Sequence, residues 1–268
     1  MKRVIKFGIF TLVAYVIFLF VTFPAARAYH YVSDRFPPTI KLYGLKGSVW
    51  SGKAELIILA SQHYRNASWK FQPKSLFSGE ALFYLDLDNG QSQIKGNVGI
   101  NIAKSLVLKD LVLQQELVDL QALAQTSAIV GGKISGRVES LVLSQVNITE
   151  ADAHFVLRDV ALLLPRRTEW GDFKIDIEKS DTDTLAKIAD QGGPLLAKGS
   201  ITVSESNEYN VDLSVQAASG ASNDLIRGID LFGRPGNDGN VHLNYKGSLS
   251  ELLGAKAVVK PAANDKPA

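Results

Sequence analysis

The sequence of 268 residues contains no cysteine. This absence excludes disulfide bonds, thiolate metal sites and a cysteine nucleophile. The four histidines, His30, His63, His154 and His242, are far apart and form no pair with the spacing of metal ligands. The net charge is only +2, so there is neither a basic surplus that would suggest nucleic acid nor an acidic tail. We therefore expect no cofactor, no metal and no nucleic-acid partner.

Catalytic motifs are also lacking. Residues 131–133 (Gly-Gly-Lys) resemble part of a phosphate-binding loop, but Ser127 replaces its first glycine and Ile134 replaces the hydroxyl residue after the lysine. We expect a β-turn there instead. Asp86 and Asp88 form a carboxylate pair, which we interpret as the solvated face of a strand. Asp181 and Asp183 form another, which we interpret as helix-capping residues. The sequence thus predicts no catalytic residue, and we do not expect an enzyme.

The feature that organises the chain is an uninterrupted apolar run over residues 7–23, preceded by Lys2, Arg3 and Lys6. A helix needs roughly 20 apolar residues, with a lower limit near 17, to cross the hydrocarbon core of a membrane. The run just reaches that limit, and the basic cluster is expected to stay in the cytoplasm. We predict a cytoplasmic segment over residues 1–6 and a transmembrane helix over residues 7–23, with the rest of the chain on the far side.

Two alternatives exist for this run. A cleaved signal peptide would have an apolar core of about 7–15 residues followed by a small-x-small site, which Ala26, Arg27 and Ala28 resemble. The run is longer than such a core, and Arg27 lies unfavourably beside the bond to be cut. The other alternative is a buried core helix. The retained helix and the signal peptide both place the remainder of the chain across the membrane.

Residues 24–38 are expected to form a short stalk that ends at Pro37 and Pro38, because proline removes a backbone donor. From residue 39 to residue 253 apolar and polar residues alternate in many segments, as in an antiparallel sheet with one covered face. Asn89 and Gly90 predict a two-residue hairpin turn. About a dozen antiparallel strands follow from this pattern, and the fold class is all-β.

A few short helices interrupt the strands. The spacing of Leu117, Leu120 and Leu123 predicts one over residues 116–125. A second is expected to begin at Asp181 or Asp183, and a third covers residues 223–232. The tail over residues 254–268 is too polar to pack, and we expect it to be disordered.

Trp50 and Trp69 both border segments punctuated by glycine or proline near the membrane-proximal end. Core packing is the plainer explanation for both. The functional alternative is a surface that contacts a partner protein or lipid, since tryptophan is enriched at binding hot spots. We therefore name Trp50 and Trp69 as a candidate interaction surface.

Four segments in this order, behind an apolar amino-terminal run, resemble one family. They are residues 47–54 (GSVWSGKA), 69–79 (WKFQPKSLFSG), 231–233 (LFG) and 239–247 (GNVHLNYKG). The chain is similar to the type II secretion system protein N family, also called general secretion pathway protein N. The likeness extends over nearly the whole chain, but the tail after Leu253 departs from it.

The resemblance implies an accessory, single-pass inner-membrane component of the type II secretion machinery, with its β domain in the periplasm of a Gram-negative bacterium. That machinery moves folded proteins from the periplasm through the outer membrane, so other components of the system are the expected partners. The family has no catalytic residues that could be assigned to positions of this sequence. It is also distantly similar to AsmA-like proteins, which implies a large, curved sheet and, as an alternative function, a groove that binds or transfers lipid. An exported hydrolase is a third hypothesis, supported only by scattered serine, aspartate and histidine residues.

Overall fold

The computed structural model describes residues 2–35, 40–59, 62–118, 129–144, 147–164 and 166–248. Three helical segments come first: α1 (Lys2–Val21), α2 (Ala25–Val32) and the 3₁₀ helix η1 (Ser33–Arg35). A second 3₁₀ helix, η2 (Pro73–Ser78), joins two strands, and α4 (Asn223–Asp230) lies near the end of the described chain. The remaining elements are strands.

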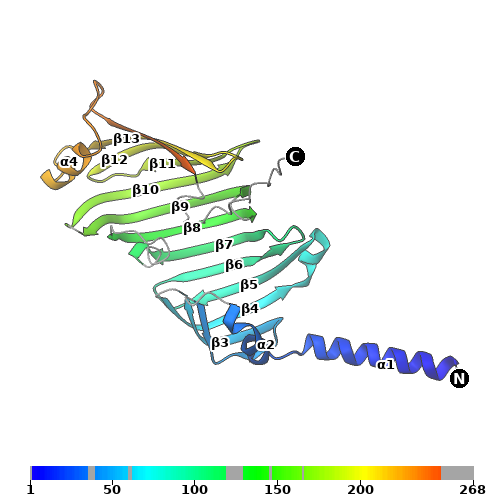
Figure 1. Ribbon diagram of the computed structural model, residues 1–268. Helices are drawn as coiled ribbons and strands as arrows, with labels where there is room; N and C mark the ends of the chain where they lie inside the picture. Colours follow the sequence, from blue (N-terminus) through cyan, green and yellow to red (C-terminus); the bar gives the residue numbers. More distant parts are fainter. Residues whose placement is uncertain are drawn as a thin grey trace, which may run out of the picture.

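These strands are β1 (Ile40–Tyr43), β2 (Lys46–Gly47), β3 (Ser51–Leu59), β4 (Gln62–Gln72), β5 (Glu80–Asp88), β6 (Gln93–Asn101), β7 (Leu106–Glu116), β8 (Ile129–Ser144), β9 (Asn147–Leu164), β10 (Thr168–Lys179), β11 (Thr184–Asp190), β12 (Leu195–Val203), β13 (Glu208–Ala217) and β14 (Val241–Ser248). They form one 14-stranded sheet, and every pair in it is antiparallel. From β3 onward the order in the sheet is the order in the sequence (Figure 1). The prediction of an antiparallel all-β domain with a few helices is confirmed.

The hairpin between β5 and β6 differs from its prediction in the length of its turn. The last register pair is Asp88 with Gln93, so residues 89–92 form a four-residue loop instead of a two-residue one. The side-chain oxygen of Asn89 accepts hydrogen bonds from the backbone N–H groups of Gln91 and Ser92, at 3.0 and 2.6 Å. These bonds satisfy the loop backbone locally and stabilise the wider turn.

The helix predicted from Asp181 or Asp183 is wrong, because the segment forms strand β11. This strand pairs with β10 on one side, where Ile188 faces Ile175, and with β12 on the other. Short apolar runs fit either period, and here two neighbouring strands supply partners for the backbone of β11. Asp183 contributes its backbone oxygen, which accepts from Ser180 N at 2.8 Å, to the turn that precedes the strand.

The pair Gly131 and Gly132 does not form the expected β-turn but lies inside β8. Gly132 has φ +124° at a register shift between β8 and β9, a backbone conformation that favours glycine. The helix expected over residues 116–125 is described only at its start, where residues 117–118 are helical. Residues 119–128 and the predicted tail over residues 254–268 lie outside the described residues.

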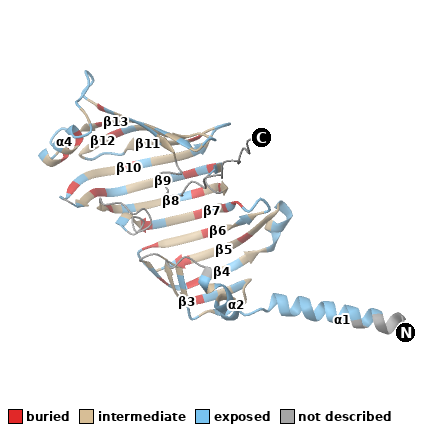
Figure 2. Ribbon diagram, in the orientation of Figure 1, coloured by how far each residue is buried: buried red, intermediate tan, exposed pale blue. Residues whose placement is uncertain are grey.

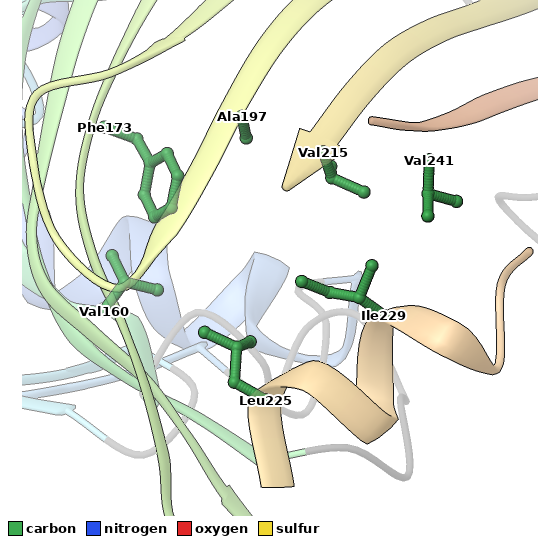
Figure 3. Close-up of a cluster of buried hydrophobic side chains, with 7 residues drawn as sticks. All are labelled: Val160, Phe173, Ala197, Val215, Leu225, Ile229 and Val241. Atoms are coloured by element: carbon green, nitrogen blue, oxygen red, sulfur yellow. The ribbon is translucent and has the colours of Figure 1, made fainter. Parts of the chain in front are cut away.

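The third predicted helix is confirmed as α4. The hydroxyl of Ser222 accepts a hydrogen bond from Leu225 N at 3.2 Å and so caps the first turn. Leu225 and Ile229 are buried and point from α4 toward Val215 and Val241 of the last two strands (Figure 3). This helix therefore covers one face of the sheet at its β12–β14 end.

The sheet is curved where its strands bring distant side chains together. Tyr64 of β4 donates from its hydroxyl to Gln115 Oε1 of β7 at 2.9 Å, although β5 and β6 lie between the two strands. In a flat sheet these strands would be about 14 Å apart. Curvature thus creates a buried face without a second sheet.

Helix α1 projects away from the sheet, and the large apolar side chains described between Phe7 and Val21 are exposed (Figure 2). Within the part of the chain that the structure describes, no helix combines the length and the apolar character that crossing a membrane requires. The transmembrane helix expected over residues 7–23 stays a prediction. The expected stalk contains α2, and Tyr29 of this helix accepts a hydrogen bond from Leu42 N of β1 at 3.3 Å, so α2 is attached to the edge of the sheet.

Candidate interaction surfaces

Trp50 joins α1 to the sheet. It directly precedes β3, and its Nε1 donates to the backbone oxygen of Phe20 in α1 at 2.8 Å. Its ring centroid lies 4.7 Å from that of Phe20 and 5.1 Å from that of Phe71, which in turn lies 5.2 Å from that of Phe83. A row of four aromatic rings therefore runs from the end of α1 across β4 to β5.

Trp69 of β4 is placed beside this junction. Its Nε1 donates to Val49 O at 3.0 Å, and its ring packs against a buried cluster that includes Tyr64 and Leu87. The structure thus brings both predicted tryptophans to one end of the sheet, where each uses its N–H group within the chain. Both indoles are half-buried, so each also retains some accessible surface.

A crevice of about 900 Å³ lies at the junction of α1, α2 and the segment before β3. Phe20, Phe23 and Trp50 are the aromatic residues that line it, and Arg27 contributes a basic side chain. The junction is fixed by backbone contacts as well: Val49 N donates to Phe23 O at 3.0 Å, and an antiparallel bridge joins Pro24 to Ser48. The crevice is suited to apolar groups, with a cation at one side.

A second concavity, which we call the apolar groove, has a volume of about 480 Å³. Its walls come from β8 to β13 and from Leu117 after β7, and they are made of apolar or aromatic side chains, including Leu157, Val160, Phe173, Ile188, Ala197 and Leu213. Helix α4 adjoins it through the buried cluster that also contains Val160 and Phe173 (Figure 3). Walls of this kind can hold apolar groups but offer little for acid–base or nucleophilic chemistry.

One group of side chains has the composition of a cation site. Glu139, Asp152 and His154 each place a ligand atom within 4.8 Å of the others. Asp152 and His154 are exposed, and His154 Nδ1 already contacts Asp176 Oδ1 at 2.8 Å. Hydrogen bonds from Lys174 and, secondarily, from His154 lower the pKa of Asp176. Asp152, His154 and Asp176 thus form a network of charges on neighbouring strands, whereas the adjacent Glu139 Oε2 is buried without a hydrogen-bond partner among the described residues.

The carboxylate pair Asp86 and Asp88 is likewise a surface feature. Lys95 Nζ lies 3.3 Å from Asp86 Oδ1 and 3.8 Å from Asp88 Oδ2. The backbone N–H of Gly90 and then the amide of Gln93 lower the pKa of Asp88. Both carboxylates are partly solvated and ion-paired, in agreement with the interpretation from sequence.

The model of the family "Type II secretion system (T2SS), protein N" matches residues 38–244, which covers the sheet from β1 into β14. The chain belongs to this family. No curated protein and no solved structure matches the chain. Protein N membership confirms the resemblance derived from the four sequence segments and establishes a role in type II secretion.

Two of the four family-like segments lie at the junction of α1 with the sheet. Residues 47–54 contain the Trp50 segment and the start of β3, and residues 69–79 run from Trp69 through η2. Residues 231–233 follow α4, while residues 239–247 lead into and fill most of β14. The apolar groove could not be predicted from the sequence, because its walls come from Leu117 and six strands, and each strand contributes only a few residues.

Proposed function

We propose that this chain is an accessory inner-membrane subunit of a type II secretion system that supports export of folded periplasmic proteins across the outer membrane. It acts by contacting other components of the system and not by catalysis. The observation that carries the proposal is the family match over nearly the entire sheet. The partly solvated, ion-paired carboxylates and the apolar concavities described above support a binding role.

The proposed place of the protein is the inner membrane, with α1 as the single membrane segment and the sheet in the periplasm. Large apolar side chains such as Phe10, Leu12 and Phe18 are exposed on α1, and a helix that is apolar all round is stable only in apolar surroundings. The basic residues Lys2 and Arg3 favour a cytoplasmic amino-terminal end. A topology reporter fused after Leu59 tests the orientation, and cytoplasmic activity of the reporter would contradict it.

The end of the sheet opposite α1 is a good site at which to detect partner subunits (Figure 1). After α4 the side chains of Leu231 and Phe232 are 87% and 63% exposed. Large exposed apolar side chains are typical of protein contacts when they are grouped. A photo-crosslinking residue at Leu231 or Phe232 in cells is expected to capture another secretion component, whereas the same residue at Gln91 is not.

The matching genetic test is deletion of the gene followed by measurement of exported proteins in the medium. Reduced export, restored by the wild-type chain, is the expected result. If export is unchanged and no crosslink to a secretion component forms at either position, the subunit proposal fails.

Lipid binding is a second candidate, and the apolar groove is the observation that favours it. Its volume of about 480 Å³ lies within the range of about 300–1,000 Å³ typical of small-ligand pockets. Native mass spectrometry of the detergent-extracted full chain is expected to show a bound lipid, and Ala197→Trp, which fills the groove, is expected to remove it. A chain that carries no lipid, or carries it equally well with the filled groove, contradicts this candidate.

A further inference from the structure

Two turns of the sheet together expose a group of large apolar side chains, which we call the tip patch: Leu76, Phe77, Ile100 and Ile102. Phe77 of η2 is 95% exposed, and Ile102 of the β6–β7 turn is 90% exposed. The two turns form one structure, because Ile102 N donates to Gly79 O at 3.0 Å. Such complete exposure of neighbouring apolar side chains indicates a contact surface.

The tip patch lies at the same end of the strands as the α1 junction. Trp50, whose indole is bonded to α1, accepts a hydrogen bond on its backbone oxygen from Phe71 N at 2.7 Å. Phe71 lies two residues before η2, so the chain passes from that contact directly into the tip. Figure 1 shows α1 leaving the sheet on the side to which these turns project.

The charges of the two turns have one sign. Lys74 and Lys104 are exposed, and residues 73–79 and 101–105 contain no acidic residue. At the other end of the β5–β6 hairpin the loop over residues 89–92 reads Asn-Gly-Gln-Ser, with neither large apolar side chains nor charge. Exposed aromatic and aliphatic side chains beside lysines match the interface of a membrane that contains anionic lipids.

We propose that the tip patch inserts into the surface of the membrane that holds α1, where Lys74 and Lys104 bind anionic lipid headgroups. This inference rests on the proposed membrane location of α1. A single helix can rotate and tilt in the membrane together with the domain that is fixed to it, whereas a second membrane contact fixes the direction of both. The tip therefore sets the angle at which the sheet stands on the membrane and the direction in which α4 is presented.

The absence of cysteine permits a direct test with single-cysteine variants of the full chain. Ser78→Cys reports on the tip, Thr11→Cys on α1 and Gln91→Cys on the opposite loop. Each is labelled with an environment-sensitive fluorophore and reconstituted into phosphatidylethanolamine vesicles with phosphatidylglycerol and nitroxide-bearing lipid. Quenching at Ser78 and Thr11, but not at Gln91, is the expected result.

The three labels separate the two proposals. Quenching at Thr11 with none at Ser78 overturns the tip contact and leaves the location of α1 intact. No quenching at either position overturns both. No quenching at Ser78 in vesicles, together with a crosslink to another secretion component from a photo-crosslinking residue at position 78 in cells, assigns the tip patch to a partner subunit and overturns the membrane contact.

Substitutions then identify the side chains. Phe77→Asp with Ile102→Asp is expected to reduce quenching at Ser78 to the level at Gln91, while Gln91→Asp changes nothing. In anionic vesicles, Lys74→Glu and Lys104→Glu are each expected to lower the ratio of membrane-bound to unbound tip patch at least about fivefold. Because these residues are exposed, the circular dichroism spectrum is expected to stay that of the wild-type sheet. Unchanged quenching in the double aspartate variant overturns the proposal.

Discussion

Gly52 of β3 lies directly opposite Trp69 of β4, and a methyl group on Gly52 would come within 2.4 Å of the indole carbon Cζ2. It would also come within 2.6 Å of Lys46 O. The indole covers the position where another residue would have its side chain, and from there its Nε1 reaches Val49 O. Glycine at position 52 is therefore required by close packing of the tryptophan.

The first prediction concerns this contact. Gly52→Ala is expected to lower the free energy of unfolding by about 1–3 kcal/mol, because the added methyl group forces the indole away from its site. Urea unfolding followed by tryptophan fluorescence measures the effect. The control is Gly228→Ala in α4, where nothing lies within 4 Å and alanine is expected to stabilise the helix by about 0.5–1 kcal/mol. Equal urea midpoints for Gly52→Ala and the wild type would contradict the packing argument.

The second prediction concerns the buried hydrogen bond between Tyr64 and Gln115. Tyr64→Phe removes the hydroxyl that donates to the amide oxygen of Gln115. We expect this loss to lower the free energy of unfolding by about 1–3 kcal/mol. The matched variant is Tyr245→Phe, whose side chain is exposed and whose effect is expected to stay within about 0.5 kcal/mol. If both variants unfold at the same urea concentration, the bond contributes nothing measurable to the stability of the sheet.

The third prediction concerns the contact of α4 with the sheet. Ile229→Ala is expected to lower the free energy of unfolding by about 2–5 kcal/mol, because it leaves a cavity in the cluster with Val215 and Val241. Ile226→Ala, on the same helix but exposed, is expected to change it little. Hydrogen exchange of the α4 backbone distinguishes local release of the helix from unfolding of the whole sheet. Equal exchange in both variants would show that α4 does not depend on this cluster.

The fourth prediction concerns pH. Hydrogen bonds from the side chain and backbone of Asn240, and then from His242, lower the pKa of Asp238 from 3.8 to about 2. A carboxylate with a lowered pKa stabilises the folded state above its ordinary pKa, and this contribution is lost as the pH falls toward 2. Carboxyl NMR titration of the full chain in micelles is expected to give the low value.

Two variants test the cause of that low pKa. Asn240→Ala is expected to raise the pKa of Asp238 toward 3.8, and His242→Ala is expected to raise it less, because Asn240 supplies the larger contribution. A pKa that stays near 2 in Asn240→Ala would contradict the assigned cause.

The sheet could be predicted from the sequence because its signal is local. Strands such as β5 and β13 alternate apolar and polar residues, and short turns separate them. β11 could not be recognised in the same way, since Leu185 and Ile188 are three positions apart, as in a helix, and the backbone partners of the strand lie in β10 and β12. Gly132 was wrongly assigned to a turn for a related reason, because a glycine within a bulged strand has the same local sequence signal as a glycine in a turn.

The surfaces were harder to predict, because they join residues distant in the sequence. Trp50 and Trp69 were identified from the glycines and prolines near them, but the bond from Trp50 to Phe20 spans 30 residues and has no sequence pattern. The tip patch was not predicted from the sequence. Its available signal was the pair Leu76 and Phe77 between Pro73 and Gly79, two bulky apolar residues in a segment too short to bury them.

The agreement between sheet order and chain order has a consequence for folding. From β3 onward each strand pairs with the strand that precedes it in the sequence. Each new strand can therefore pair as soon as it has been synthesised. The sheet can therefore grow strand by strand in the direction of synthesis, beginning beside α1, with a new growing edge after each hairpin. Since local pairings form with little loop-closure entropy, a long single sheet of this kind avoids the slow search that nonlocal β topologies require.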